Sequence, residues 1–419
     1  MKTIVFLEVQ KFGSSREAIR AAEQMGYYTV LLTNRSSFWE KRSEFPDVHL
    51  MRLCNLTDIE EILDNIKALE LRALDIHSII SFVDPYCYTA CLIAEKFGVN
   101  RFSTQAILTM EDKILSREVL AQSPYVPQYQ VLSGELSGNS IKESINKQVK
   151  YVLKSPNSTG SKDVYLSNGD TKLERYVGVL QKKYPGAPIL IEEFLDGRQY
   201  LVEVVVYRQE IYIMAIIEQE ITFNKKFIVT GYSLLVEVEA VFLQSLRDAV
   251  GDIIRLHGMK SGTCHLELRL THGEWKLIEI NPRISGAGMN RLIECGFGIN
   301  LVEQTLKISL GQEPNFRAKF KKPVYAQYVI LSETGYLVKV TGKKRAAQSP
   351  GVLEVYVKPR KGRLLTPPLS MGDRYAYVIA QGSTQQEAED NAKQAAAEIR
   401  FWLSEQPITA DNAPGSLEK

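Results

Sequence analysis

Two neighbouring segments of alternating apolar and polar residues constrain the fold of this chain more than any other feature. Residues 262–270 and 275–282 alternate in this way, and the short segment 271–274 between them contains Gly273. A period of two residues is typical of a strand with one buried face, and a four-residue connection with a glycine favours a hairpin turn. The sequence therefore predicts an antiparallel β-hairpin.

One face of the predicted hairpin is polar. It carries His265, Glu267 and Arg269 on the first strand, and Glu279 and Asn281 on the second. We expect Glu267 and Glu279 to lie within about one residue of being opposite each other. Carboxylates in such positions repel each other unless a cation lies between them, and carboxylate and amide oxygens suit Mg²⁺. A solvated hairpin face explains these residues, taken alone, equally well.

Length, charge and cysteine content narrow the class of protein. The chain has 419 residues, 45% of them apolar, and its 51 Lys and Arg nearly balance 49 Asp and Glu. This balance does not indicate a nucleic-acid or membrane partner. The five cysteines lack the spacing of a zinc site or a disulfide framework. The N-terminus has no signal-peptide pattern, and no apolar stretch reaches about 18 residues. We expect a cytoplasmic protein.

Residues 1–107 alternate strand and helix patterns, which predicts a parallel sheet with helices on both faces. Further along, a charged amphipathic helix is predicted over residues 109–122, and several strands and two helices follow it. Beyond residue 313 the chain is rich in strand patterns. A final helix starts at Thr384, whose spacing to Glu387 indicates a capping box. Residues 405–419 have the composition of a disordered tail.

Three further features could carry chemistry. Lys154 ends a predicted strand and precedes the Gly/Ser-rich segment 155–161, which could close over phosphate oxygens. Lys113 lies in the predicted charged helix, and the apolar strand that begins at residue 189 ends in Glu192 and Glu193. Taken singly, these features are more typical of an ordinary turn, a solvated helix residue and a strand end.

Their order along the chain is more specific than any one of them. Lys113, Lys154 with its loop, the sequence EEFLDG at 192–197, Glu267 and the sequence EINPR at 279–283 follow one another. This series resembles the ATP-grasp superfamily of carboxylate–amine ligases. The resemblance implies an α/β protein with an α+β core. Its parts are an N-terminal parallel α/β domain (1–107), an ATP-grasp core (108–312) with a lid lobe at about 123–190, and a small β-rich C-terminal domain (313–404).

The resemblance also implies roles for individual residues. Arg283 and Lys154 are the implied catalytic residues, and Glu267, Glu279 and Asn281 the implied ligands of two Mg²⁺ ions, with Mn²⁺ left open. The implied ATP contacts are Lys113, Lys154, Ser155, Ser158, Thr159, Gly160, Ser161, Glu192, Glu193, Phe194, Leu195 and Gln199. The family usually has a glutamate at the last of these positions, where it binds the ribose hydroxyls.

A narrower resemblance concerns the substrates. The sequences HLELRL and IEINPRISGAG, together with the C-terminal stretch, are similar to the L-amino-acid ligases, which form dipeptides from two amino acids. We expect amino acids as partners besides ATP, and a homodimer stays open. The small residues of SGAG let a backbone approach a ligand closely. The candidate substrate-binding residues are Asp84, His265, Arg283, Ser285, Gly286 and Gly288.

Three alternatives remain from the sequence. An ATP-grasp ligase for another acid and amine has the same motifs. A non-catalytic nucleotide or amino-acid sensor is disfavoured, because competent side chains fill the phosphate and metal positions. Residues 313–363 contain twelve Lys and Arg against three Glu, but no recognisable nucleic-acid-binding motif. A solvated basic surface is the better interpretation of that segment.

Overall fold

The computed structural model describes residues 1–133, 149–155, 160, 162–168, 170–224 and 226–407. The chain forms two compact units, and each is described here by itself. The first unit comprises Met1–Pro127, Leu195–Ile216 and Glu237–Phe320, and the second comprises Gln128–Phe194, Ile217–Val236 and Lys321–Lys419. Each unit is therefore assembled from three separate stretches of sequence.

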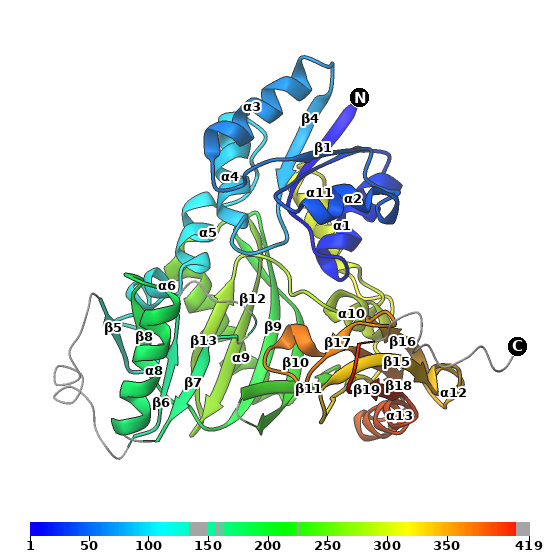
Figure 1. Cartoon of the computed structure of the whole chain (residues 1–419). Helices are drawn as coiled ribbons and strands as arrows, with labels where there is room; N and C mark the ends of the chain where they lie inside the picture. The colour runs from blue at the N-terminus through cyan, green and yellow to red at the C-terminus, as the bar shows by residue number, and fades with distance from the viewer. Residues whose placement is uncertain (134–148, 156–159, 161, 169, 225, 408–419) are drawn as a thin grey trace, which may run out of the picture. The chain divides into compact units, whose positions relative to one another are not determined.

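A parallel sheet opens the first unit, as predicted. Its strands lie in the order β3-β2-β1-β4 and span Lys2–Leu7 (β1), Tyr28–Thr33 (β2), Leu50–Leu53 (β3) and Asp75–Ile80 (β4). The helices of this layer are α1 (Ser14–Gln24), α2 (Ser36–Glu40), α3 (Ile59–Glu70) and α4 (Cys87–Lys96), with a 3-10 turn at Arg42–Glu44. Helices α3 and α4 cover one face of the sheet through a buried cluster that includes Val5, Ile66 and Ile93 (Figure 1).

The predicted hairpin lies in an antiparallel sheet of the same unit. Strand β12 (Gly262–Thr271) pairs with β13 (Glu274–Asn281) on one side and with β9 (Arg198–Tyr207) on the other. Strand β10 (Glu210–Asn224) follows β9 in the sheet order and continues into the second unit. The other helices of the unit are α5 (Thr104–Glu111), α6 (Lys113–Val119), α9 (Ala240–His257), α10 (Met289–Phe297) and α11 (Leu301–Ser309).

The single helix predicted over residues 109–122 is wrong. The chain instead forms α5 and α6, separated by Asp112, whose backbone is extended. The Asp112 carboxylate accepts hydrogen bonds from the N–H groups of Ile114 and Leu115, at 2.7 and 3.1 Å. Aspartate is a strong N-cap residue because it satisfies donors that have no partner within the first turn. A new helix therefore starts at Lys113.

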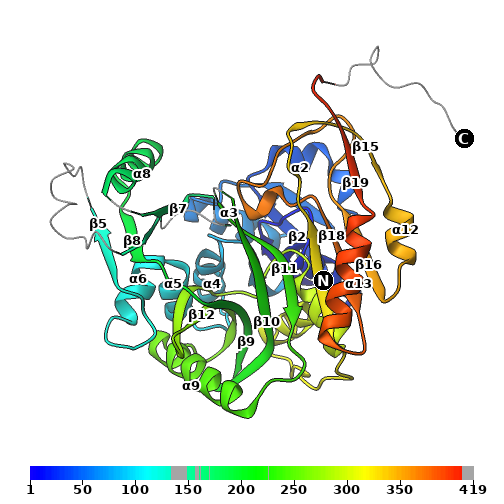
Figure 2. The ribbon, with the colours of Figure 1, turned by 90° about the horizontal axis from the view of Figure 1, so that it is seen from below.

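The first sheet of the second unit is antiparallel and has the order β5-β8-β6-β7. It consists of Tyr129–Leu132 (β5), Tyr151–Lys154 (β6), Val164–Ser167 (β7) and Ile189–Glu193 (β8). Helix α8 (Asp170–Lys183) covers one face of this sheet (Figure 2). Leu173 and Val177 of α8 pack there against Leu153 and Ile191.

The rest of the second unit is β-rich. Strands β11 (Lys226–Leu234), β14 (Val324–Val329), β18 (Ala376–Gln381) and β16 (Val352–Val357) extend the end of β10 in that order, all antiparallel. A smaller sheet contains β15 (Gly335–Thr341), β17 (Leu364–Leu365) and β19 (Arg400–Ser404). The remaining elements are α12 (Lys343–Gln348), a 3-10 turn at Met371–Asp373 and α13 (Gln385–Ala397), which packs against β14 and β18.

The end of α13 differs from the sequence prediction in one respect. Thr384 caps the helix by accepting a hydrogen bond from the Glu387 N–H at 3.1 Å, as the capping box requires. The chain then leaves the helix after Ala397 and forms β19, which the sequence analysis did not predict. Strand β19 pairs with β15, more than 50 residues earlier in the chain. The predicted tail lies mostly outside the described residues, which end at residue 407.

Candidate active site

The register of β12 and β13 brings the predicted metal ligands together. Glu267 lies directly opposite Glu279, and His265 lies opposite Asn281. On the other side of β12, Glu203 of β9 is the register partner of His265. Because register partners share a face of the sheet, three neighbouring strands form one polar face. The prediction that Glu267 and Glu279 are near neighbours is confirmed.

The two carboxylates have nitrogen donors beside them. The Lys113 Nζ lies 3.4 Å from Oε1 of Glu279. The Gln199 side-chain amide donates to Glu267 Oε2 at 3.2 Å and accepts from Nε of Arg269 at 3.0 Å. Gln199, the predicted ribose contact, is thus held between a carboxylate and a guanidinium. Its role toward ribose stays a prediction.

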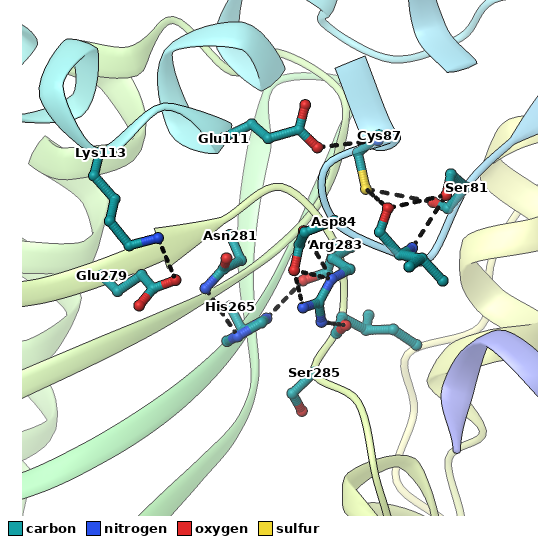
Figure 3. A network of polar contacts seen from close by, with 12 residues as sticks. Ser81, Asp84, Cys87, Glu111, Lys113, His265, Glu279, Asn281, Arg283 and Ser285 are labelled. Atoms are coloured by element: carbon teal, nitrogen blue, oxygen red, sulfur yellow. Dashed lines mark hydrogen bonds and ion pairs between the residues drawn. The ribbon is translucent and has the colours of Figure 1, made fainter. Parts of the chain in front are cut away.

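Asn281 is oriented by a neutral histidine. His265 Nδ1 lies 2.9 Å from the Arg283 carbonyl oxygen, which can only accept, so Nδ1 carries the proton. Nε2 then accepts from the Asn281 amide at 3.3 Å (Figure 3). Burial, together with Arg283, lowers the pKa of His265 to about 4, which keeps the ring neutral at pH 7. The hydrogen bond commits the amide nitrogen of Asn281 to His265 and turns its oxygen away from the ring.

This set of donors fits a divalent cation. Glu267, Glu279 and Asn281 offer two carboxylates and one amide oxygen, which are the hard ligands that Mg²⁺ prefers. The fixed orientation of Asn281 is what a ligand requires from its surroundings. These residues could hold Mg²⁺. The number of ions that they bind stays a prediction.

Two substrate candidates from distant parts of the chain form one ion pair. The Arg283 guanidinium donates from Nε to both Asp84 carboxylate oxygens at 3.0 Å, and its Nη2 also contacts Oδ2 (Figure 3). Burial lowers the pKa of Arg283, but the Asp84 carboxylate outweighs this effect and raises it above its ordinary value. A forked contact of this kind fixes the plane of a guanidinium. Sequence analysis named both residues but did not pair them.

Glu111 is a functional candidate that sequence analysis missed. Its carboxylate accepts hydrogen bonds from the N–H groups of Cys87 and Tyr88, at 3.0 and 3.2 Å, where α4 begins. Burial, together with the nearby Asp84, raises the pKa of Glu111 to about 7. Among the described residues, Asp84, Cys87 and Glu111 bring possible cation ligands within 4.8 Å of one another. In the sequence Glu111 lies inside a charged segment, and nothing there distinguishes it from a glutamate exposed to solvent.

Glu203 was also missed. It lies in the apolar strand β9, and its carboxylate accepts a hydrogen bond from the Ser285 N–H at 3.1 Å and another from the Ser285 hydroxyl. Burial raises the pKa of Glu203 to about 7, although the hydrogen bonds from Ser285 oppose the shift. A single carboxylate inside a run of valines was the available signal, because a buried charge requires a partner.

The second unit holds the other predicted ATP contacts. Lys154 forms a buried ion pair with Glu192 of the adjacent strand β8. Phe194 donates its N–H to the Lys150 carbonyl oxygen at 2.7 Å, and Glu193 Oε1 accepts from the Gln128 N–H at 2.9 Å. Ser155 is buried and Gly160 is exposed, whereas Ser158, Thr159 and Ser161 lie outside the described residues. Leu195, in the first unit, accepts a hydrogen bond from Arg269.

Comparison with known protein families adds to this geometry. Residues 148–291 match the model of the ATP-grasp domain. The chain carries an ATP-grasp domain. Residues 327–404 match the model of the L-amino acid ligase C-terminal domain 2. The predicted resemblance to ATP-grasp ligases of the L-amino-acid ligase branch is confirmed, and with it the prediction of an ATP-dependent carboxylate–amine ligase.

Individual proteins show the same likeness. The chain is 28% identical over 137 residues to an L-arginine-specific L-amino acid ligase of Bacillus subtilis, a match that spans 32% of each protein. It is 24% identical over 315 residues to dapdiamide A synthase of Enterobacter agglomerans, which covers 67% of this chain and 72% of that protein.

Solved structures confirm the ATP-grasp fold. An L-amino acid ligase from Bacillus licheniformis superimposes with a TM-score of 0.82 at 17% identity, covering 96% of this chain and 99% of that one. Phosphoribosylglycinamide synthetase from Anaerococcus prevotii gives a TM-score of 0.71 at 14% identity, covering 96% and 100%. Within the described part of the chain, none of the helices combines the length and apolar character needed to cross a bilayer.

Proposed function

We propose that the protein joins the carboxylate of one L-amino acid to the amine of another, with conversion of ATP to ADP and phosphate. The observation that carries this proposal is the polar face of β9, β12 and β13, where Glu267 lies opposite Glu279 and Asn281 is oriented beside them. The C-terminal match to L-amino acid ligases supports amino acids as the substrates.

The reaction requires an activated acid, because a carboxylate does not react with an amine in water. An oxygen of the first substrate's carboxylate attacks the γ-phosphorus of ATP, and the bond to the β-phosphate oxygen breaks to give an acyl phosphate and ADP. The second substrate's neutral amine then attacks the acyl carbon, loses a proton and expels phosphate. Phosphoryl transfer depends mainly on positioning and charge neutralisation, which bound Mg²⁺ supplies when held by Glu267, Glu279 and Asn281.

The chain's own cations have separate parts in this proposal. Lys113 and Lys154 contact ATP phosphates as point charges. Arg283 neutralises the phosphoryl group during transfer, and Asp84 keeps its guanidinium in one plane. Arg283 also lies two residues before Ser285, where the segment proposed to bind the activated acid begins. The same side chain can therefore serve both the transfer and the acyl phosphate.

The test is ADP release across a matrix of amino acids, offered singly and in pairs, with mass spectrometry of the products. We expect ADP release that depends on specific amino acids, together with a product whose mass equals that of the two substrates minus water. ADP release with no amino-acid dependence would contradict the dipeptide proposal. In that case acids and amines of other classes would be screened next, since the fold is shared with ligases such as phosphoribosylglycinamide synthetase.

A further inference from the structure

A buried carboxylate that the proposed reaction does not use holds the first residue of the segment 285–288. Glu203 is 1% exposed, and Ser285 is buried as well. The Ser285 N–H lies 3.1 and 3.4 Å from the two Glu203 oxygens, and the Ser285 hydroxyl donates to Oε1. Both polar hydrogens of Ser285 are therefore directed at one carboxylate.

A second contact holds the same segment two residues later. Gly13 precedes α1 and has a φ of 82°. A Cβ built on Gly13 would lie 2.7 Å from the Ala287 carbonyl oxygen and 2.8 Å from its nitrogen, which is closer than real Cβ contacts. Only glycine allows this approach. The backbone of Ala287, itself at a φ of 54°, is thus packed directly against the loop before α1.

Between these two contacts the segment faces open space. A Cβ built on Gly286 would meet no atom within 4 Å, and its φ is not in the left-handed region. The segment is therefore fixed at Ser285 and Ala287 and open at Gly286. This arrangement is what a pre-organised ligand contact requires, because the backbone is ordered before the ligand arrives.

We propose that Glu203 is a positioning residue, which holds the segment 285–288 in the conformation that receives the carboxylate being activated. This inference rests on the proposed function, in which that segment binds the acid. Glu203 acts through Ser285, because its nearly complete burial keeps its oxygens away from a substrate. Without it, the N–H and hydroxyl of Ser285 would be buried with no acceptor, and the segment would move to satisfy them.

The test compares Glu203→Gln, which keeps one acceptor oxygen, with Glu203→Leu, which keeps none. Two quantities are measured: the steady-state KM values for the acid and for ATP, and amide hydrogen exchange over residues 284–290. For Glu203→Leu we expect the acid KM to rise about tenfold or more and exchange to speed up by a similar factor, since one lost hydrogen bond is worth roughly that much. The ATP KM should stay within about twofold, and Glu203→Gln should keep both readouts within about threefold of wild type.

The opposite results are equally specific. Unchanged exchange over 284–290 in Glu203→Leu would overturn the proposal. So would a Glu203→Gln protein with slow turnover, normal acid KM and normal exchange, which would indicate proton transfer. If Glu203→Leu does not fold, Ser285→Ala removes the hydroxyl contact alone and should raise the acid KM by a smaller factor. If no amino acid supports ADP release in wild type, the proposed function fails, but the exchange comparison still decides what Glu203 holds.

Gly13 and Gly26 allow the second contact to be compared with a site that has no contact. Both glycines flank α1 and have φ values of 82° and 83°, but a Cβ on Gly26 would meet no atom within 4 Å. Gly13 also has a ψ of −167°, a combination nearly restricted to glycine, and only Gly13→Ala displaces Ala287. We expect both variants to lower the melting temperature, Gly13→Ala by more, with a rise in acid KM of about fivefold or more in Gly13→Ala alone. Equal acid KM values in the two variants would show that Gly13 does not hold the segment.

Discussion

Two regions of the protein bring charged side chains together, and they do so in different ways. In the hairpin β12–β13 Glu267 lies opposite Glu279, the Lys113 Nζ lies 3.4 Å from Glu279, and the Glu279 side chain stays 26% exposed. In the second unit Lys154 and Glu192 contact each other directly, with side chains only 7% and 5% exposed. The hairpin is open to a ligand, whereas the Lys154–Glu192 pair is largely closed to solvent.

The difference teaches that similar charges in these two places should have different consequences when they are removed. Carboxylates on an accessible face stay solvated and change the free energy of unfolding little, so their removal should affect binding and catalysis more than stability. In a buried ion pair each charge compensates the other, so the loss of one partner leaves the remaining charge uncompensated away from solvent. The predictions below follow from this contrast.

The largest expected effect is on catalysis. Glu279→Gln should reduce ADP formation by about a hundredfold or more, because a neutral amide cannot hold a divalent cation against the triphosphate. Its melting temperature should stay within about 2 °C of wild type. Glu274→Gln, on the exposed start of the same strand, is the control and should keep normal turnover. Near-normal turnover in Glu279→Gln would contradict the metal assignment and the contrast between the two regions.

The next effect is on stability. Lys154→Met should lower the free energy of unfolding by about 3–5 kcal/mol, because it leaves Glu192 buried without its ammonium partner. The double variant Lys154→Met, Glu192→Leu should regain most of that loss, while both variants lose ATP turnover. Denaturant unfolding measures the first result, and Lys172→Met on the exposed surface of α8 is the control. Equal stabilities of the single and double variants would show that the two charges are not coupled.

The smallest expected effect is a pH dependence that comes from Glu203 on β9, the strand beside the hairpin. Burial raises the pKa of Glu203 to about 7, above its ordinary value in the unfolded chain. Below pH 4.5 Glu203 is protonated in both the folded and the unfolded chain, so its ionisation does not change the free energy of unfolding. As pH rises from about 4.5 to 7, wild type should therefore lose up to about 3 kcal/mol of stability relative to Glu203→Gln, and the difference should then stay constant. Parallel stability curves for the two proteins over this range would contradict the raised pKa.

The hairpin site could be predicted from sequence because its geometry is local. The alternation of residues 262–270 and 275–282 and the short turn between them determine which side chains share a face. What remained open was the register, and the structure settles it with Glu267 opposite Glu279. The break between α5 and α6 was missed, although its signal is also local: an aspartate before an apolar run is a typical N-cap, and Asp112 is such a residue.

Contacts between distant segments could not be predicted in the same way. Asp84 and Arg283 are 199 residues apart, and the loop after β4 meets the segment after β13 only in the tertiary structure. Glu203 and Ser285 are likewise 82 residues apart. A valine-rich strand indicated only that Glu203 is buried. The partner of Glu203 is set by tertiary structure, which neither the periodicity nor the spacing of residues in the sequence reveals. Strand β19 was missed for the same reason, because it pairs with a distant strand.

The interleaved course of the chain has a consequence for protein engineering. Because each compact unit draws on three separate stretches, the chain crosses between them five times, near residues 127, 194, 216, 236 and 320. Recombination with a homologue at a single crossover would therefore mix parental segments inside at least one core. Chimaeras should tolerate exchange of all three stretches of a unit together far better than exchange of any contiguous block. The same property makes truncation a poor route to a crystallisable fragment.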